Sequence, residues 1–164
     1  MASKNVRPDY YFKLDEAAKK RHEEKLAVFK LSTDPFSLKE NSFDCTKNIK
    51  KWSGITFADI FSYLINFPSM YTNKGLKAYK SLDSYKYVLS GLVFDVKVKD
   101  IDTRTFLVVG RVRHGQSMLI KTPNFSWLGI QDDGEVINAH CTCMAGLGEV
   151  CSHVGALTFY MLKR

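Results

Sequence analysis

The chain has 164 residues, of which 45% are hydrophobic and 13% aromatic, a composition that supports a buried core and excludes a largely disordered chain. No apolar run approaches the roughly 18 residues of a membrane span, and residues 1–13 lack the apolar segment of a secretory signal. We therefore expect an intracellular protein in a reducing compartment, with the nucleus favoured over the cytoplasm and no membrane partner.

Basic residues outnumber acidic ones, with 24 Lys and Arg against 17 Asp and Glu, which gives a net charge of +7. This excess favours a polyanionic partner such as nucleic acid, because cations that contact phosphates release counterions. The same charge also fits a domain that carries it only for solubility. No block of Lys and Arg is dense enough to decide between the two.

The first half of the sequence predicts helices. Residues 14–31 are rich in helix-forming types and begin with Asp15 and Glu16, where the helix dipole favours acids. The run KKRHEEK (19–25) within this helix is expected to face solvent. Residues 32–52 are polar and contain helix breakers, so they predict a loop.

A second helix is expected to begin at Thr56, where Thr56 and Asp59 have the spacing of a capping box. Its apolar face is expected to comprise Phe57, Ile60, Phe61 and Leu64. A third and shorter helix is expected after Thr72. These aromatic-rich helices are expected to form core rather than a ligand site.

From Tyr87 the hydrophobic period changes to two, which is typical of strands. The first strand is expected to bury Leu92, Phe94, Val96 and Val98. Residues 105–113 are expected to return as a second strand, which would gather Lys97, Lys99, Arg111 and Arg113 on one face. That face is a candidate phosphate-binding surface, and a plain solvated face is the alternative. Three further cations, Lys121, Lys163 and Arg164, are expected near the C-terminal module.

Asp133-Gly134 predicts a hairpin turn whose second arm leads directly into the segment HCTCMAGLGEVCSH (140–153). Two-residue spacing at the end of a strand points Cys141 and Cys143 to one face and His140 to the other. Residues two apart within a helix lie about 200° apart, so Cys151 is expected at the cap of a final helix and His153 in its first turn.

Three thiolates and one imidazole form a tetrahedral zinc set without an open position, which is typical of a structural site. A Cys141–Cys151 disulfide, a Cys/His nucleophilic pair and incidental buried cysteines are the alternatives. A disulfide would leave Cys143 odd, and a nucleophile needs one thiol rather than three, so one structural zinc ion is favoured. His140 is expected at the surface or beside the ligands, and Cys45 is expected to be a free thiol.

The order C-x-C, spacer, C-x-H resembles the SWIM-type zinc finger, and all four ligand positions match in CTCMAGLGEVCSH. The resemblance implies a ββα unit over about residues 136–162 that binds zinc and serves in DNA binding or protein contact. A longer stretch, from residue 78 to the finger, resembles animal SWIM proteins in which a phage-type (YqaJ-like) recombinase nuclease domain often follows. That domain is not found in these 164 residues, so no nuclease activity is expected of them.

The sequence as a whole predicts an α+β protein with mostly helical residues 1–86, antiparallel strands over 87–135 and a SWIM-type finger over 136–164. We expect a binding module rather than an enzyme, with no small-molecule substrate, because no P-loop, GxSxG or HExxH motif occurs. Nucleic acid, with DNA favoured, is the expected partner. A protein partner, with the zinc purely structural, is the alternative.

Overall fold

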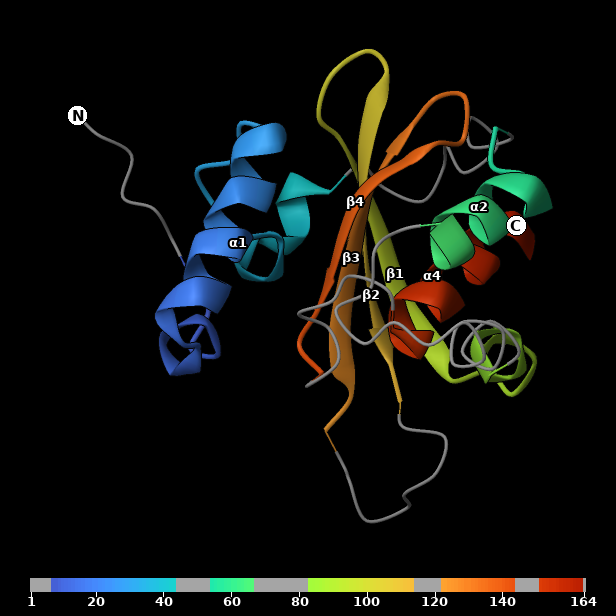
Figure 1. The fold of residues 1–164 in the computed structure, drawn as a ribbon, viewed down its shortest axis with the longest axis horizontal. Coiled ribbons are helices and arrows are strands. Elements are labelled where there is room, and N and C mark those ends of the chain that lie inside the picture. Colours follow the sequence, from blue (N-terminus) through green and yellow to red (C-terminus); the bar gives the residue numbers. More distant parts are fainter. Residues whose placement is uncertain (1–6, 44–53, 67–82, 114–121, 144–150, 164) are drawn as a thin grey trace.

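Helices cover both faces of an antiparallel sheet in the computed structural model, which describes residues 7–43, 54–66, 83–113, 122–143 and 151–163. Helix α1 (Glu16–Val28) lies on one side of the sheet, and helices α2 (Phe57–Asn66) and α4 (Ser152–Lys163) lie on the other (Figure 1). The expected α+β class is confirmed. None of the described helices has the length and apolar character needed to cross a membrane.

The sheet is a meander in which each strand pairs with the next one along the chain. Its four strands are β1 (Val93–Asp100), β2 (Thr105–Val112), β3 (Asn124–Gln131) and β4 (Val136–Cys141), in that order and antiparallel throughout. The expected hairpin turn between β3 and β4 is present. Gly134 has a φ of 96°, a backbone conformation that glycine adopts without a steric penalty.

A β-bulge changes which face of β1 is buried. It lies at Asp95, where the register with β2 shifts between Phe94 and Lys97 and φ is 52°. The extra residue reverses the alternation, so the expected burial of Leu92 and Phe94 together with Val96 is wrong. The apolar residues of β1 that pack against the larger core are Val93, Val96 and Val98. Phe94 instead faces the side of the sheet that carries α1.

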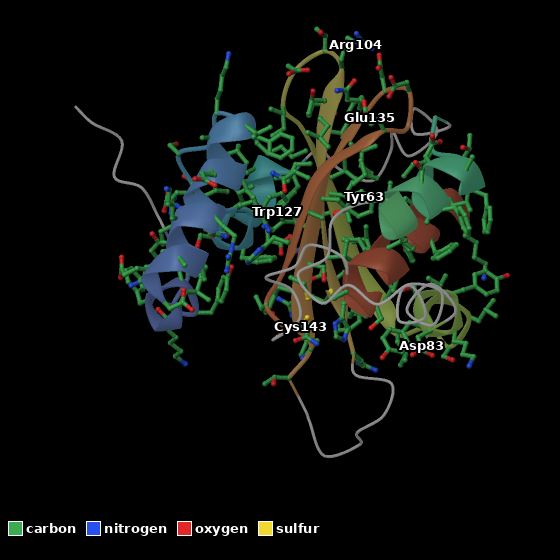
Figure 2. The ribbon with its side chains drawn as sticks, in the orientation of Figure 1. Tyr63, Asp83, Arg104, Trp127, Glu135 and Cys143 are labelled. Carbon is green, nitrogen blue, oxygen red and sulfur yellow. The ribbon has the colours of Figure 1, made fainter. Side chains whose placement is uncertain are left out.

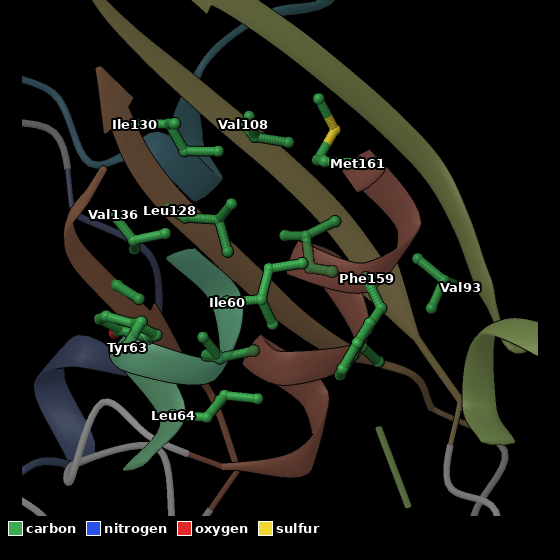
Figure 3. Close-up of a cluster of buried hydrophobic side chains, with 14 of the residues drawn as sticks. Ile60, Tyr63, Leu64, Val93, Val108, Leu128, Ile130, Val136, Phe159 and Met161 are labelled. Carbon is green, nitrogen blue, oxygen red and sulfur yellow. The ribbon is translucent and has the colours of Figure 1, made fainter. Parts of the chain in front are cut away.

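The larger core lies between the sheet and the helices α2 and α4 (Figure 3). The capping box of α2 is confirmed, since Thr56 N donates to Asp59 Oδ2 at 2.7 Å and Asp59 N donates to Thr56 Oγ1 at 3.3 Å. The helix rotates its apolar face differently from expectation, because Phe57 and Phe61 are 59% and 49% exposed. The residues of this core include Ile60, Tyr63, Leu64, Val108, Leu128, Val136, Val154, Leu157 and Phe159.

A second, smaller core holds α1 against the opposite face of the sheet. Asp15 caps the helix by accepting from Ala18 N at 2.7 Å, as the sequence predicts. Figure 2 shows Trp127 on the side of α1 and Tyr63 on the side of α2. The buried members of the smaller core are Leu26, Phe29, Leu107, Val109 and Trp127. The short 3-10 helices η1 (Tyr11–Lys13), η2 (Pro35–Ser37) and η3 (Glu40–Ser42) flank α1 in sequence.

The expectation that residues 19–25 face solvent is wrong for His22 and Lys25, which are only 1% and 5% exposed. Their positions follow the helical period of Ala18, Leu26 and Phe29, so they lie on the stripe that meets the sheet. Lys25 Nζ donates to Ala139 O on β4 at 3.1 Å, and His22 Nε2 lies 2.5 Å from Asp34 Oδ2. Partners of this kind are what buried polar groups require.

The three segments expected from the sequence, residues 1–86, 87–135 and 136–164, all contribute side chains to the larger core. Examples are Ile60, Val108 and Leu157. Of the helix expected after Thr72, the part before residue 83 lies outside the described residues, and residues 83–89 are helical. Cys45 also lies outside the described residues. The described part of the expected 32–52 loop contains η2 and η3.

Gly129 on β3 makes the approach of α1 possible. A Cβ added at this position would lie 2.0 Å from Phe29 Cζ, so Gly129→Ala forces the Phe29 ring or the helix to move. We expect this variant to lower the free energy of unfolding by about 1–3 kcal/mol, measured by urea denaturation.

The matched control is Phe29→Leu in the Gly129→Ala background. The shorter side chain removes the overlap, and part of the lost stability is expected to return. An unchanged free energy of unfolding for Gly129→Ala alone would show that α1 does not rest on β3.

Candidate metal centre

Three cysteines and one histidine meet where β4 ends and α4 begins. Cys141 is the last residue of β4, Cys143 follows two residues later, Cys151 directly precedes α4, and His153 lies in the first turn of α4. Their ligand atoms all lie within 4.8 Å of one another, so they are close enough to hold a metal ion. Cys141, Cys151 and His153 are buried, and Cys143 is partly exposed. Figure 2 labels Cys143 at one end of the sheet.

Local backbone geometry explains how the sulfurs are positioned. Cys151 occupies the N-cap position of α4, where its Sγ accepts from Val154 N at 3.4 Å, as a serine or aspartate oxygen does at other helix starts. At the end of β4, Cys143 N donates to Cys141 Sγ at 3.4 Å across a two-residue turn. Both backbone donors favour negative charge on the sulfurs that they contact.

The electrostatic environments of Cys151 and Cys141 shift the pKa values of their thiols in opposite directions. Hydrogen bonds from the Cys141 and Cys143 side chains lower the pKa of Cys151 well below its usual range. Its place at the positive end of α4 acts in the same direction. Burial raises the pKa of the Cys141 thiol. The thiolate is the form of cysteine that binds metal, so this environment favours the metal-binding form of Cys151.

A buried amide orients the histidine. Asn124, the first residue of β3, places Nδ2 3.1 Å from His153 Nε2, and both side chains are buried. The neighbouring His153 also lowers the pKa of Cys151. With Nε2 directed at Asn124, Nδ1 is the ring nitrogen that can serve as a ligand atom. This contact fixes the orientation of the imidazole. For Nδ1 to bind a metal ion, Nε2 must carry the ring proton, and the Asn124 amide then presents Oδ1 rather than Nδ2 to it, because Nδ2 only donates.

The dimensions of the cluster suit a single ion. Four donors about 2.3 Å from a common centre in a tetrahedron lie roughly 3.8 Å from one another. The observed set spans at most 4.8 Å, so shifts of about 1 Å or less bring all four donors to one ion. The described cysteines are free thiols, and the alternative Cys141–Cys151 disulfide is not present.

His140 points away from the cysteines, as strand alternation predicts, but it is not at the surface. It is 2% exposed, its Nε2 is hydrogen-bonded to the Tyr10 hydroxyl, and its Nδ1 lies 3.4 Å from Lys25 Nζ. Burial, together with the charge of Lys25, lowers the pKa of His140 well below its usual value, so the ring is neutral. Tyr10, His22, Lys25, Asp34 and His140 together form a buried polar network beneath α1.

Sequence reasoning did not identify this network or Asn124. The helical spacing of His22 and Lys25 with the apolar residues of α1 was the available signal for part of the network. Asn124 carries no signal, because its partner His153 is 29 residues away and reaches it only through the pairing of the sheet with α4.

The candidate nucleic-acid residues do not form one surface. Lys97, Lys99, Arg111 and Arg113 lie together on the α1 side of β1 and β2. Lys163 lies ten residues after His153, about 15 Å along α4, on the opposite side of the sheet. Lys121 and Arg164 are outside the described residues.

Acidic residues neutralise part of the basic face. Lys97 forms ion pairs with Glu40 and Asp95, and Arg111 Nε lies 3.2 Å from Asp95 Oδ2. Lys99 Nζ donates to Ser42 O at 2.9 Å. The face is therefore partly covered by the segment that contains η3.

Comparison of the chain with family models, with curated proteins and with solved structures gives no match.

The variant Asn124→Leu tests whether the Asn124 side chain orients His153 for metal binding. The leucine is similar in volume but cannot hydrogen-bond to Nε2, so we expect the affinity for Co²⁺, used as a probe, to fall roughly 10- to 100-fold. Titration followed by the visible absorption of the thiolate complex measures the change. Ser126→Ala, on the same face of β3, is the control and should bind as the unmodified protein does. Equal affinity of the two variants would contradict the role of Asn124.

Proposed function

We propose that Cys141, Cys143, Cys151 and His153 hold one structural zinc ion, and that the chain is a zinc-dependent binding module. The observation that carries this proposal is the convergence of four donors within 4.8 Å at the junction of β4 and α4. Three sulfurs and one imidazole nitrogen are a donor set that zinc prefers in four-coordinate structural sites. With four protein ligands, the ion has no open position for a substrate or an activated water.

The proposed ion joins the edge of the sheet to the helix that covers it. Zinc contributes roughly 10–16 kcal/mol in isolated zinc-finger peptides, which is comparable with the roughly 5–15 kcal/mol of net stability of a whole domain. In this chain the ion would act together with the larger core, in which Leu128 of β3 packs with Val154 and Leu157 of α4.

We assign the module to the SWIM type as part of the same proposal. The C-x-C, spacer, C-x-H order supports this assignment, and so does the arrangement of a strand end followed by a helix start. A binding role rather than an enzymatic one is consistent with a closed donor set. A nuclear location belongs to this proposal too.

Nucleic acid, with DNA favoured, is the proposed partner. The net charge of +7 and the gathering of Lys97, Lys99, Arg111 and Arg113 on one sheet face support it. Because Asp95 and Glu40 pair with two of these cations, the contribution from phosphate contacts is expected to be modest.

A protein partner is the second candidate, and exposed aromatic residues favour it. Phe57 and Phe61 of α2 stack with ring centroids 6.3 Å apart, and both are largely exposed. Tyr85 and Leu89, 48% and 58% exposed, add apolar surface from the helical segment 83–89. Exposed apolar side chains of this kind are typical of protein contacts.

Metal content is the first test. We expect one zinc ion per chain by mass spectrometry of protein purified under reducing, chelator-free conditions, and loss of that ion in Cys143→Ser. Cys45→Ser removes the only cysteine outside the cluster and should keep the ion. Metal-free unmodified protein, or a zinc content that depends on Cys45, would overturn the proposal.

Salt dependence separates the two candidate partners. If nucleic acid is the partner, affinity for a DNA duplex or a single strand is expected to fall as salt increases from 50 to 200 mM, with a slope set by the number of phosphates contacted. If a protein is the partner, neither nucleic acid binds measurably even at the lowest salt. Fluorescence anisotropy with labelled oligonucleotides distinguishes these results.

A further inference from the structure

We propose that the end of the sheet next to the metal centre, on its α1 side, binds single-stranded DNA by stacking bases on two paired arginine and phenylalanine side chains. This inference rests on the proposed nucleic-acid function and specifies the form of DNA. It arises from aromatic residues that lie among the basic residues of the face.

A row of side chains crosses three strands at this end. Phe94 of β1 pairs with Arg111 of β2, and Arg111 pairs with Phe125 of β3. Directly paired residues share a face of the sheet, and neighbouring strands lie about 4.8 Å apart. The row therefore presents two rings with a guanidinium between them. Both rings are partly exposed, in contrast to Trp127, which is buried further along the same face of β3.

Each ring is covered by a planar cation. The guanidinium carbon of Arg111 lies 4.8 Å from the centre of the Phe125 ring, and that of Arg113 lies 4.7 Å from the centre of the Phe94 ring. A phenylalanine ring beneath a guanidinium group fixes the orientation of that planar group. A base can then stack on the exposed side of the guanidinium. A four-stranded sheet with planar groups on adjacent strands suits two or three consecutive bases.

The side chains of Phe94, Arg111, Arg113 and Phe125 together form a platform on this face of the sheet. A groove of about 100 Å³ continues the platform toward η2 and η3. Its lining includes the aromatic rings of Phe36, Phe43 and Phe125, the cations Lys97 and Arg111, and the carboxylates Glu40 and Asp95, which pair with those cations. Lys97 Nζ lies 5.9 Å from the centre of the Phe43 ring, which makes a third pair of cation and aromatic ring on this face. Aromatic rings that alternate with cations are typical of surfaces along which unpaired nucleotides bind.

The charge available at the platform is small but well placed. Among the described residues Arg113 makes no ion pair, and its side chain is exposed. Arg111 gives one of its five N–H donors, at Nε, to Asp95. With two or three phosphates contacted, the salt slope for a single strand is expected to be about −1.4 to −2.1. Stacking then supplies much of the affinity, and duplex DNA, whose base faces are already stacked, cannot use it.

The platform is attached to the proposed zinc site. Phe125 O accepts from Thr142 N at 2.9 Å, and Phe125 N donates to Thr142 Oγ1 at 3.1 Å. Thr142 lies between Cys141 and Cys143, so the ion that would fix those two residues would also fix the backbone that carries Phe125.

The test compares a labelled dT oligonucleotide with the dT·dA duplex of equal length, and with a rU oligonucleotide, by fluorescence anisotropy. The variant Arg113→Lys retains the positive charge and loses the planar guanidinium group on which a base can stack. We expect it to weaken dT binding at least about five-fold with an unchanged salt slope, and Phe94→Leu to do the same. Arg104→Lys is the matched control, since Arg104 lies at the opposite end of the sheet (Figure 2), and it should bind as the unmodified protein does.

Three results would overturn the inference and can be told apart. Binding of duplex and dT with equal affinity, unaffected by Arg113→Lys, would show that phosphates alone are contacted and would leave the proposed function standing. Tighter binding of rU than of dT would overturn the assignment to DNA. No binding of any oligonucleotide at 50 mM salt would overturn the proposed function as well. Thermal unfolding of each variant separates a lost contact from a lost fold.

Discussion

The whole structure depends on the need to cover both faces of its sheet. Trp127 and Leu128 are neighbours on β3, point in opposite directions, and are both fully buried. An antiparallel sheet commonly leaves one face to solvent, but these strands bury apolar residues at consecutive positions. A helical layer on one face alone would leave the apolar residues of the other face exposed to water. Helix α1 is therefore needed on one side and the pair α2 and α4 on the other, and the two cores share the strands between them.

The metal centre lies at the point where one of these layers is joined to the sheet. Cys151 both caps α4 and presents its sulfur to the cluster, so one side chain starts the helix and would bind the ion. Cys141, the residue of the cluster on β4, directly follows His140 in the chain. His140 points to the opposite face of the sheet, where it contacts Tyr10 and Lys25. A single peptide unit thus separates the proposed zinc site from the polar network beneath α1.

The sequence was most informative where structure is local. The two-residue spacing of Cys141 and Cys143, the capping box at Thr56 and the turn at Gly134 each depend on residues close in the chain, and each is present. The rest depends on distant partners. The bulge at Asp95 follows from pairing with β2, the burial of His22 from contact with the sheet, and the place of Asn124 from a helix that begins 28 residues later. Neither propensity nor periodicity contains that information.

Helix α1 and its partner strand are separated by much of the chain. Lys25 bonds to Ala139, 114 residues away. At a synthesis rate of about 5–20 residues per second, the helix waits about 6–23 s for β4 to be made. Until β2 and β3 have been made, its sheet-facing stripe has no sheet to pack against, and His22 and Lys25 make this stripe partly polar. The two residues that are hardest to bury in the finished protein are those that keep the nascent helix compatible with water.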